Sequence, residues 1–107
     1  MMIELKSKSE LHEILSGNKN VLLDFYADWC GPCQTLLPIV ESLAEEHKED
    51  LIVAKVNVDH NQELASEYRV RNIPALFFIK DQDVQEKLVG LQSKNQLKGL
   101  INKHARA

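Results

Sequence analysis

Apolar residues recur along this chain with two different periods, which separate its strands from its helices. Asn20–Ala27 is a compact apolar run rich in strand formers and predicts a buried strand. Leu51–Asp59 alternates, with one face wholly apolar, and predicts another strand. From Cys33 to about Glu49, apolar residues return at three- and four-residue steps, which indicates a helix. Pro38 lies inside that pattern and predicts a bend in the helix.

Capping and turn signals complete the order of elements. Ser7 with Glu10 and Ser93 with Gln96 have the spacing of capping boxes, so helices are expected near residues 8–16 and after Ser93. The remaining predicted elements are strands at Met2–Lys6, Ala75–Lys80 and Val84–Val89, a short helix at Asn61–Tyr68 and a turn at 81–83. The resulting order is β-α-β-α-β-α-β-β-α. It predicts an α/β fold with a central mixed β-sheet of about five strands flanked by about four helices.

Composition and charge narrow the class of protein. The chain has 107 residues and 44% hydrophobic content, which fits one globular domain over residues 1–107. Thirteen basic and sixteen acidic residues give a net charge of −3, and the basic residues are scattered, so nucleic-acid binding is not expected. The apolar stretches are too short to span a bilayer, and the first residues lack the apolar run of a signal peptide. These features predict a cytoplasmic monomer without membrane attachment.

Both cysteines of the chain lie in Cys30-Gly31-Pro32-Cys33, where a predicted strand meets a predicted helix. A CxxC pair in such a domain indicates redox chemistry. Residues three apart in a helical turn lie on one side, with Cα atoms roughly 5–6 Å apart, within disulfide range. Pro32 suits the first helical turn, where free N–H groups and partial positive charge favour a thiolate. We therefore predict a lowered pKa for Cys30, the cysteine nearer the open end of the helix.

A cysteine pair of this spacing can also be structural, metal-binding or inert. A structural disulfide is disfavoured by a cytoplasmic location. A zinc site needs about four ligands, and none of the four histidines has paired ligand spacing, so no metal is expected. Two inert core cysteines are disfavoured because glycine and proline lie between them at a helix start. The sequence therefore favours a redox-active pair.

Asp24 interrupts the apolar run that leads to the cysteines. A carboxylate in a central strand loses hydration, so its pKa is expected to rise toward neutrality, where it can exchange a proton. It precedes Cys30 by six residues, close enough to approach the pair. A solvated aspartate at a strand end is the alternative, because aspartate is seldom fully buried.

Two further side chains and one proline are candidates for the same site. Lys55 can reach the neighbouring strand, although a surface lysine that extends its amine to water fits equally well. Trp29 is either a core aromatic or a side chain that covers the reactive site and contacts substrate. Ile73-Pro74 precedes an apolar strand, and because proline cannot donate to a ladder, backbone groups there are expected to be free. Only about 5–6% of X-Pro bonds are cis, so the residues alone favour trans.

Trp29-Cys30-Gly31-Pro32-Cys33, preceded by Asp24-Phe25-Tyr26-Ala27, resembles the active-site segment of the thioredoxin family. Further matches in spacing occur at Pro38, Lys55, Asp59, Ile73-Pro74 and Val89-Gly90. The resemblance covers essentially the whole chain and implies the thioredoxin fold. It implies a protein-disulfide reductase that binds no cofactor and acts through its Cys30–Cys33 disulfide on disulfide-containing target proteins. A flavin-dependent thioredoxin reductase would recharge the pair from NADPH.

The resemblance also implies a role for each site residue. Cys30 would attack the target disulfide and form a mixed disulfide, which Cys33 would resolve. Asp24, through water and with Lys55 nearby, would handle the proton at Cys33. Pro74 would be cis and face the cysteines, and the backbone of Ile73 would pair with an extended target segment. The remaining residues implied to line the contact surface are Trp29, Gly31, Pro32 and Gly90.

Five positions depart from the commonest pattern of the family: Gln34, Asn72, Ala75, Gln82 and Leu91. They bear on which targets and which reductase are preferred. Gln82 stands in the turn, where glycine is usual in the family, so we predict a type I turn, which needs no positive φ.

Two alternative functions are consistent with the same chemistry. An oxidase or isomerase would require an oxidising compartment and a reduction potential well above that of the cytosolic glutathione pool. A regulatory subunit would bind its partners without the exchange reaction. Gly31-Pro32 resembles the reducing members of the superfamily and favours the reductase.

Overall fold

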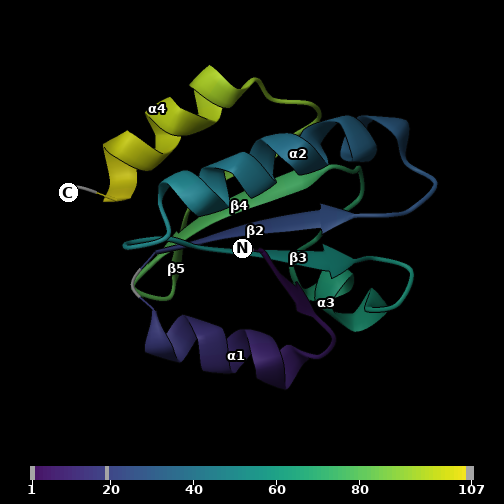
Figure 1. Ribbon diagram of the computed structural model, residues 1–107. Coiled ribbons are helices and arrows are strands. Elements are labelled where there is room, and N and C mark those ends of the chain that lie inside the picture. Colours follow the sequence, from purple (N-terminus) through teal and green to yellow (C-terminus); the bar gives the residue numbers. More distant parts are fainter. Residues whose placement is uncertain (1, 19, 106–107) are drawn as a thin grey trace.

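The computed structural model describes residues 2–18 and 20–105, and its elements follow the order that the sequence predicts (Figure 1). They are β1 (Met2–Leu5), α1 (Lys8–Gly17), β2 (Asn20–Tyr26), α2 (Gly31–Glu46), β3 (Ile52–Asn57), α3 (Gln62–Glu67), β4 (Ala75–Lys80), β5 (Asp83–Val89) and α4 (Lys94–Ala105). No predicted end is displaced by more than three residues. The alternation of strands and helices is therefore confirmed.

The five strands form one mixed sheet in the order β1-β3-β2-β4-β5. β3 pairs with both β1 and β2 in parallel, whereas β4 runs antiparallel to β2 and to β5. All seven residues of β2 are buried, because it is the central strand and has a layer of helices on each side. The prediction of a mixed five-stranded sheet with four helices is confirmed.

The helices cover the two faces of the sheet in pairs, with α2 and α4 on one face and α1 and α3 on the other (Figure 1). Successive side chains of β2 point to opposite faces. Leu22 therefore packs with Leu36 of α2 and Leu97 of α4, whereas Leu23 joins the cluster that contains Leu64 of α3. Two hydrophobic layers thus hold the central strand rigidly, and with it the start of α2.

Side-chain caps define the starts of two helices. The Ser7 hydroxyl accepts the Glu10 backbone N–H at 3.2 Å, and the Glu10 carboxylate accepts the N–H of Lys6 rather than that of Ser7. Ser93 and Gln96 form the complete capping box, with bonds of 2.8 and 3.1 Å in the two directions. Both helix starts that the sequence predicted are confirmed.

The β4–β5 turn corrects one prediction. Asp81 and Gln82 form a two-residue hairpin between the paired residues Lys80 and Asp83, and their φ angles are +50° and +72°. Two positive φ angles identify a type I′ turn, not the type I turn expected from the sequence. A type I′ turn matches the right-handed twist of the flanking strands, which a type I turn would splay apart. The geometry of the strands thus prevails over the local preference of glutamine.

The topology brings four chain segments to one edge of the sheet. The carboxyl ends of the parallel strands β2 and β3 lie side by side, with Tyr26 opposite Asn57. The antiparallel strand β4 begins at this same edge and β5 ends there, because Ala75 pairs with both Phe25 and Val89. Ligands commonly bind at such an edge in α/β proteins. Within residues 2–18 and 20–105, no helix is both long and apolar enough to cross a membrane.

Candidate active site

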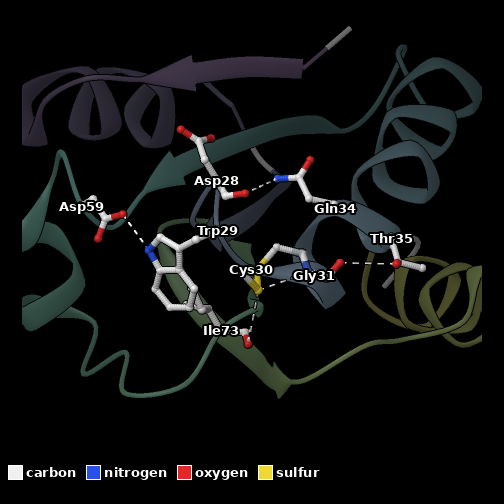
Figure 2. Close-up of a disulfide and its surroundings, with 9 residues drawn as sticks. Asp28, Trp29, Cys30, Gly31, Gln34, Thr35, Asp59 and Ile73 are labelled. Carbon is white, nitrogen blue, oxygen red and sulfur yellow. Dashed lines mark hydrogen bonds between the residues drawn. A yellow bond between two sulfur atoms is a disulfide. The ribbon is translucent and has the colours of Figure 1, made fainter.

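Cys30 and Cys33 form a disulfide at the amino end of α2 (Figure 2), with Cα atoms 5.2 Å apart, as the spacing predicts. Cys30 is the N-cap residue, and its sulfur accepts the backbone N–H of Cys33 at 3.2 Å. Pro32 lies in the first turn, where a missing N–H removes no intrahelical bond. Cys30 has the extended backbone angles of an N-cap residue (φ −88°, ψ 109°), and Cys33 lies in the first turn of the helix, so the pair closes across the helix start.

The two sulfur-bearing residues are buried to different degrees. Cys30 is 5% exposed and Cys33 2% exposed, and both pack against Tyr26 and Ala27. Cys30 lies between the exposed residues Trp29 and Gly31, at the open end of the helix. A sulfur in this N-cap position receives an N–H and faces the positive end of the helix dipole, which favours a thiolate once the disulfide is reduced.

Asp24 is fully buried beneath α2. Its side chain points to the same face as Leu22, which packs on α2, and Tyr26, which packs against the cysteines. Neither carboxylate oxygen has a hydrogen-bond partner in the described part of the chain. Burial raises the pKa of Asp24 from 3.8 to about 7, and the nearby charge of Lys55 opposes part of that rise. The expected rise is confirmed, and the alternative of a solvated aspartate at the strand end is wrong.

Lys55 is the β3 residue directly opposite Asp24 in the sheet. Its amine lies 5.3 Å from the centre of the Tyr26 ring, a cation–π contact, and the side chain is half-buried. The Tyr26 hydroxyl donates to the carboxylate of Glu4, 2.6 Å away on β1. Burial, and then this contact with Glu4, raise the pKa of Tyr26. Glu4 of β1, Lys55 of β3 and Tyr26 of β2 thus form a group of polar side chains beside the buried Asp24.

Trp29 is 71% exposed, so it is not a core aromatic. Its ring N–H donates to the carboxylate of Asp59 at 2.9 Å (Figure 2). Asp59 is held in place because its own backbone N–H donates to the Asn57 side chain, also at 2.9 Å. The sequence assigned no role to this aspartate. The signal was an Asn-x-Asp segment at the end of a strand, which is typical of a side-chain-stabilised turn.

The Ile73–Pro74 peptide bond is cis, as the family resemblance implied and contrary to the general preference for trans. The Ile73 carbonyl oxygen lies 3.8 Å from the Cys30 sulfur (Figure 2). The Gly90 N–H donates to the Pro74 carbonyl at 2.8 Å, and Gly90 has a φ of +94° that suits glycine. Ile73, Pro74 and Gly90 therefore lie on one rim beside the disulfide.

Metal ligation requires several donor side chains in one place. Within the described residues, His, Cys, Asp and Glu side chains do not come together in groups of three that could hold a metal ion. Both sulfurs are already bonded to each other. A disulfide and an exposed tryptophan lie at this edge of the sheet, and a buried carboxyl group lies two residues before the end of β2.

Comparisons with known proteins agree with this arrangement. The family model described as Thioredoxin matches residues 2–103. A thioredoxin of Mycoplasmoides gallisepticum is 45% identical over 94% of this chain and 99% of its own length. A thioredoxin of Bacillus subtilis is 46% identical over 78% of this chain and 81% of its own. The solved structure of a mutant thioredoxin from Halobacterium salinarum NRC-1 is 48% identical, with a TM-score of 0.92 over 97% of this chain and 90% of its own. Since these matches cover the fold and the cysteine pair together, the chain belongs to the thioredoxin family and is a thiol–disulfide oxidoreductase.

Proposed function

We propose that this protein reduces disulfides in other proteins, with Cys30 as the nucleophile and Cys33 as the resolving cysteine. The observation that carries the proposal is the position of Cys30. Its sulfur caps α2 and accepts the N–H of Cys33, so the helix stabilises a thiolate at the more exposed of the two cysteines. The thiolate is the species that attacks a disulfide.

The first step joins the protein to its target. The Cys30 thiolate attacks one sulfur of the target disulfide, and the other target sulfur leaves as a thiolate. A mixed disulfide between Cys30 and the target results. Reduction of the target is still incomplete, because its second sulfur is bound to Cys30.

The second step releases the target. The Cys33 sulfur attacks Cys30, the Cys30–Cys33 disulfide forms, and the second target sulfur departs with its bonding electron pair. This attack requires Cys33 to lose its proton. Asp24, with a pKa of about 7, is suited to accept that proton through a water molecule at neutral pH. Lys55 supports this role because its charge limits the rise of the Asp24 pKa.

The target segment is proposed to lie along the rim beside the disulfide. Within the described residues, no backbone hydrogen bond occupies the main chain of Ile73, so it is available to an extended peptide. Trp29, Gly31 and Pro32 are exposed next to Cys30 in the chain. Pro74 and Gly90 complete the contact surface, since the hydrogen bond between them holds in place the segment that contains Ile73.

We further propose that a thioredoxin reductase recharges the disulfide from NADPH, so that NADPH acts only indirectly. The protein is proposed to be a cytoplasmic monomer and to form one domain. A reductase role suits that location, because cytosolic thiols are kept reduced. The scattered basic residues and the net charge of −3 support a protein that does not act on nucleic acid.

Insulin reduction, coupled to NADPH oxidation by a supplied thioredoxin reductase, tests activity and recharging together. We expect catalysis by the native protein and none by Cys30→Ser. Incubation with a disulfide-containing target should trap a mixed disulfide on Cys33→Ser but not on Cys30→Ser. No acceleration over dithiothreitol alone in a parallel assay would refute the reductase. Trapping on Cys30→Ser alone would reverse the roles of the two cysteines.

A further inference from the structure

A concave surface beside the cluster that contains the disulfide carries positive charge. It is a groove of about 530 Å³ between α3 and the segments that flank it. Its lining includes Val58, Gln62, Ala65, Ser66, Arg69 and Arg71. Both arginine side chains are exposed at its rim. The groove lining contains no acidic residue among those described, although the protein as a whole has a net charge of −3.

The two guanidinium groups are not neutralised from within the described chain. Across residues 2–18 and 20–105, no carboxylate lies within 4.0 Å of Arg69 or Arg71. Two nearby acidic side chains have other partners, since Glu67 pairs with Lys8 at 3.2 Å and Asp59 accepts the Trp29 N–H. A third cation adds to the patch, because the amine of Lys87 donates to the Arg69 carbonyl at 3.2 Å.

Arg69 occupies a backbone position that is unusual for a long side chain. It follows α3 with a φ of +55°, in the left-handed region that glycine adopts without strain. The turn is held by a 3.0 Å bond from the Arg69 N–H to the Ser66 carbonyl. Arginine at this position therefore costs backbone energy and contributes a cation to the groove.

The groove is continuous with the rim of the active site. Val58 lines the groove and also packs against the cluster that contains Cys30 and Cys33. Arg71 stands two residues before Ile73, whose carbonyl lies 3.8 Å from the Cys30 sulfur (Figure 2). A peptide that pairs with Ile73 and continues in the direction of Arg71 would therefore pass from Cys30 to the groove.

We infer that Arg69 and Arg71 select targets whose disulfide cysteine is flanked by acidic residues, the groove taking an extended acidic segment of the target protein. The inference rests on the proposed function, since the target must first reach Cys30. Arg71 and Arg69 precede Ile73 by two and four residues, so we place the acidic side chains about two to four residues from the attacked cysteine. Charge complementarity speeds encounter and weakens with salt, so the preference is for rate and specificity rather than for tight binding.

Single-turnover reduction of three cyclic disulfide peptides tests this inference. The peptides differ only in the residues two to four positions from each cysteine, which are aspartate, serine or lysine. Pre-reduced protein supplies the two electrons, and thiols are trapped by alkylation and counted by chromatography. For the native protein we expect the aspartate peptide to react about fivefold faster than the lysine peptide at low salt, and the ratio to fall toward one in about 0.5 M sodium chloride.

Two variants and a matched control separate the groove from general charge effects. Arg69→Gln/Arg71→Gln should bring the aspartate-to-lysine ratio close to one and leave the serine peptide rate unchanged. Arg69→Gly should lower the ratio in part while relieving the positive φ, so its effect cannot come from strain. Lys48→Gln/Lys103→Gln removes the same charge from two exposed lysines and should keep the native ratio.

The outcomes distinguish the acidic preference from the reductase activity. A ratio that stays at its native value in Arg69→Gln/Arg71→Gln, or that falls equally in Lys48→Gln/Lys103→Gln, overturns the acidic preference and leaves the reductase standing. Absence of reduction of the serine peptide by native protein refutes the proposed function, and the inference with it.

Discussion

Replacing Asp24 with asparagine removes one charge from the interior and keeps the shape of the side chain. The native carboxyl group is fully buried, and its oxygens have no hydrogen-bond partner in the described chain. Its pKa is 3.8 in an ordinary environment and about 7 in the folded protein, because burial penalises the ionised form. Ionisation of Asp24 therefore destabilises the folded state, and Asp24→Asn should stabilise the protein wherever the native carboxyl group is charged.

The size of the effect follows from the two pKa values. A shift of one unit corresponds to about 1.4 kcal/mol. Below about pH 3 Asp24 is protonated in both the folded and the unfolded state, so its burial costs no ionisation energy. Above the pKa of Asp24 in the folded protein, the loss of unfolding free energy reaches its full value of about 4 kcal/mol. Between these limits the folded state holds more protons, so native stability falls as pH rises. The cost is about 1.7 kcal/mol at pH 5 and about 4 kcal/mol at pH 8, a difference of about 2.5 kcal/mol.

Urea unfolding of the oxidised proteins, followed by circular dichroism at pH 5, 6, 7 and 8, measures this difference. The free energy of unfolding of Asp24→Asn, relative to native, should rise steadily over that range. Asp28→Asn is the matched control, because Asp28 is exposed and four residues further along the chain; it should show no such rise. A stability difference for Asp24→Asn that does not change with pH would refute the assignment of a buried carboxyl group that ionises near neutrality. Slower insulin reduction by the more stable variant would separate its role in proton transfer from any role in folding.

Three further substitutions test individual parts of the structure. Lys55→Met should raise the pKa of Asp24 above about 7, since it removes the positive charge that opposes the rise. The pH–rate profile of insulin reduction should then move to higher pH. An unmoved profile would show that Lys55 does not act on the proton transfer. Gln82→Gly should raise the free energy of unfolding by about 1 kcal/mol, because Gln82 has a φ of +72° that glycine adopts without strain; urea unfolding would show it, and a loss of stability would contradict the type I′ turn. Gly90→Ala should lower both the free energy of unfolding and the rate of insulin reduction, because Gly90 has a φ of +94° and its N–H holds the Pro74 carbonyl. Native behaviour in urea unfolding and in insulin reduction would show that the rim formed by Ile73, Pro74 and Gly90 does not contribute to target binding.

Local sequence patterns predicted the elements of this fold well, because each depends on residues close together in the chain. The capping box of Ser93 and Gln96 forms within four consecutive residues. The cysteine geometry depends only on the N-cap and first turn of one helix, so the Cα separation of 5.2 Å is set by residues four positions or fewer apart. Where a local preference met a tertiary constraint, at Asp81 and Gln82, the prediction was wrong because strand twist selected the type I′ turn.

By itself the sequence determined the order of strands and helices, the two helix caps and a redox pair at a helix start. Only the tertiary structure decided that Asp24 is buried, that Trp29 is held outward by Asp59, and that Ile73 lies against Cys30. These contacts join residues 30 and 43 positions apart, and they exist because a mixed sheet brings the ends of β2, β3 and β5 and the start of β4 to one edge. The burial of Asp24 and the electrostatics of the site arise only when these segments come together, so no single segment of the sequence determines them.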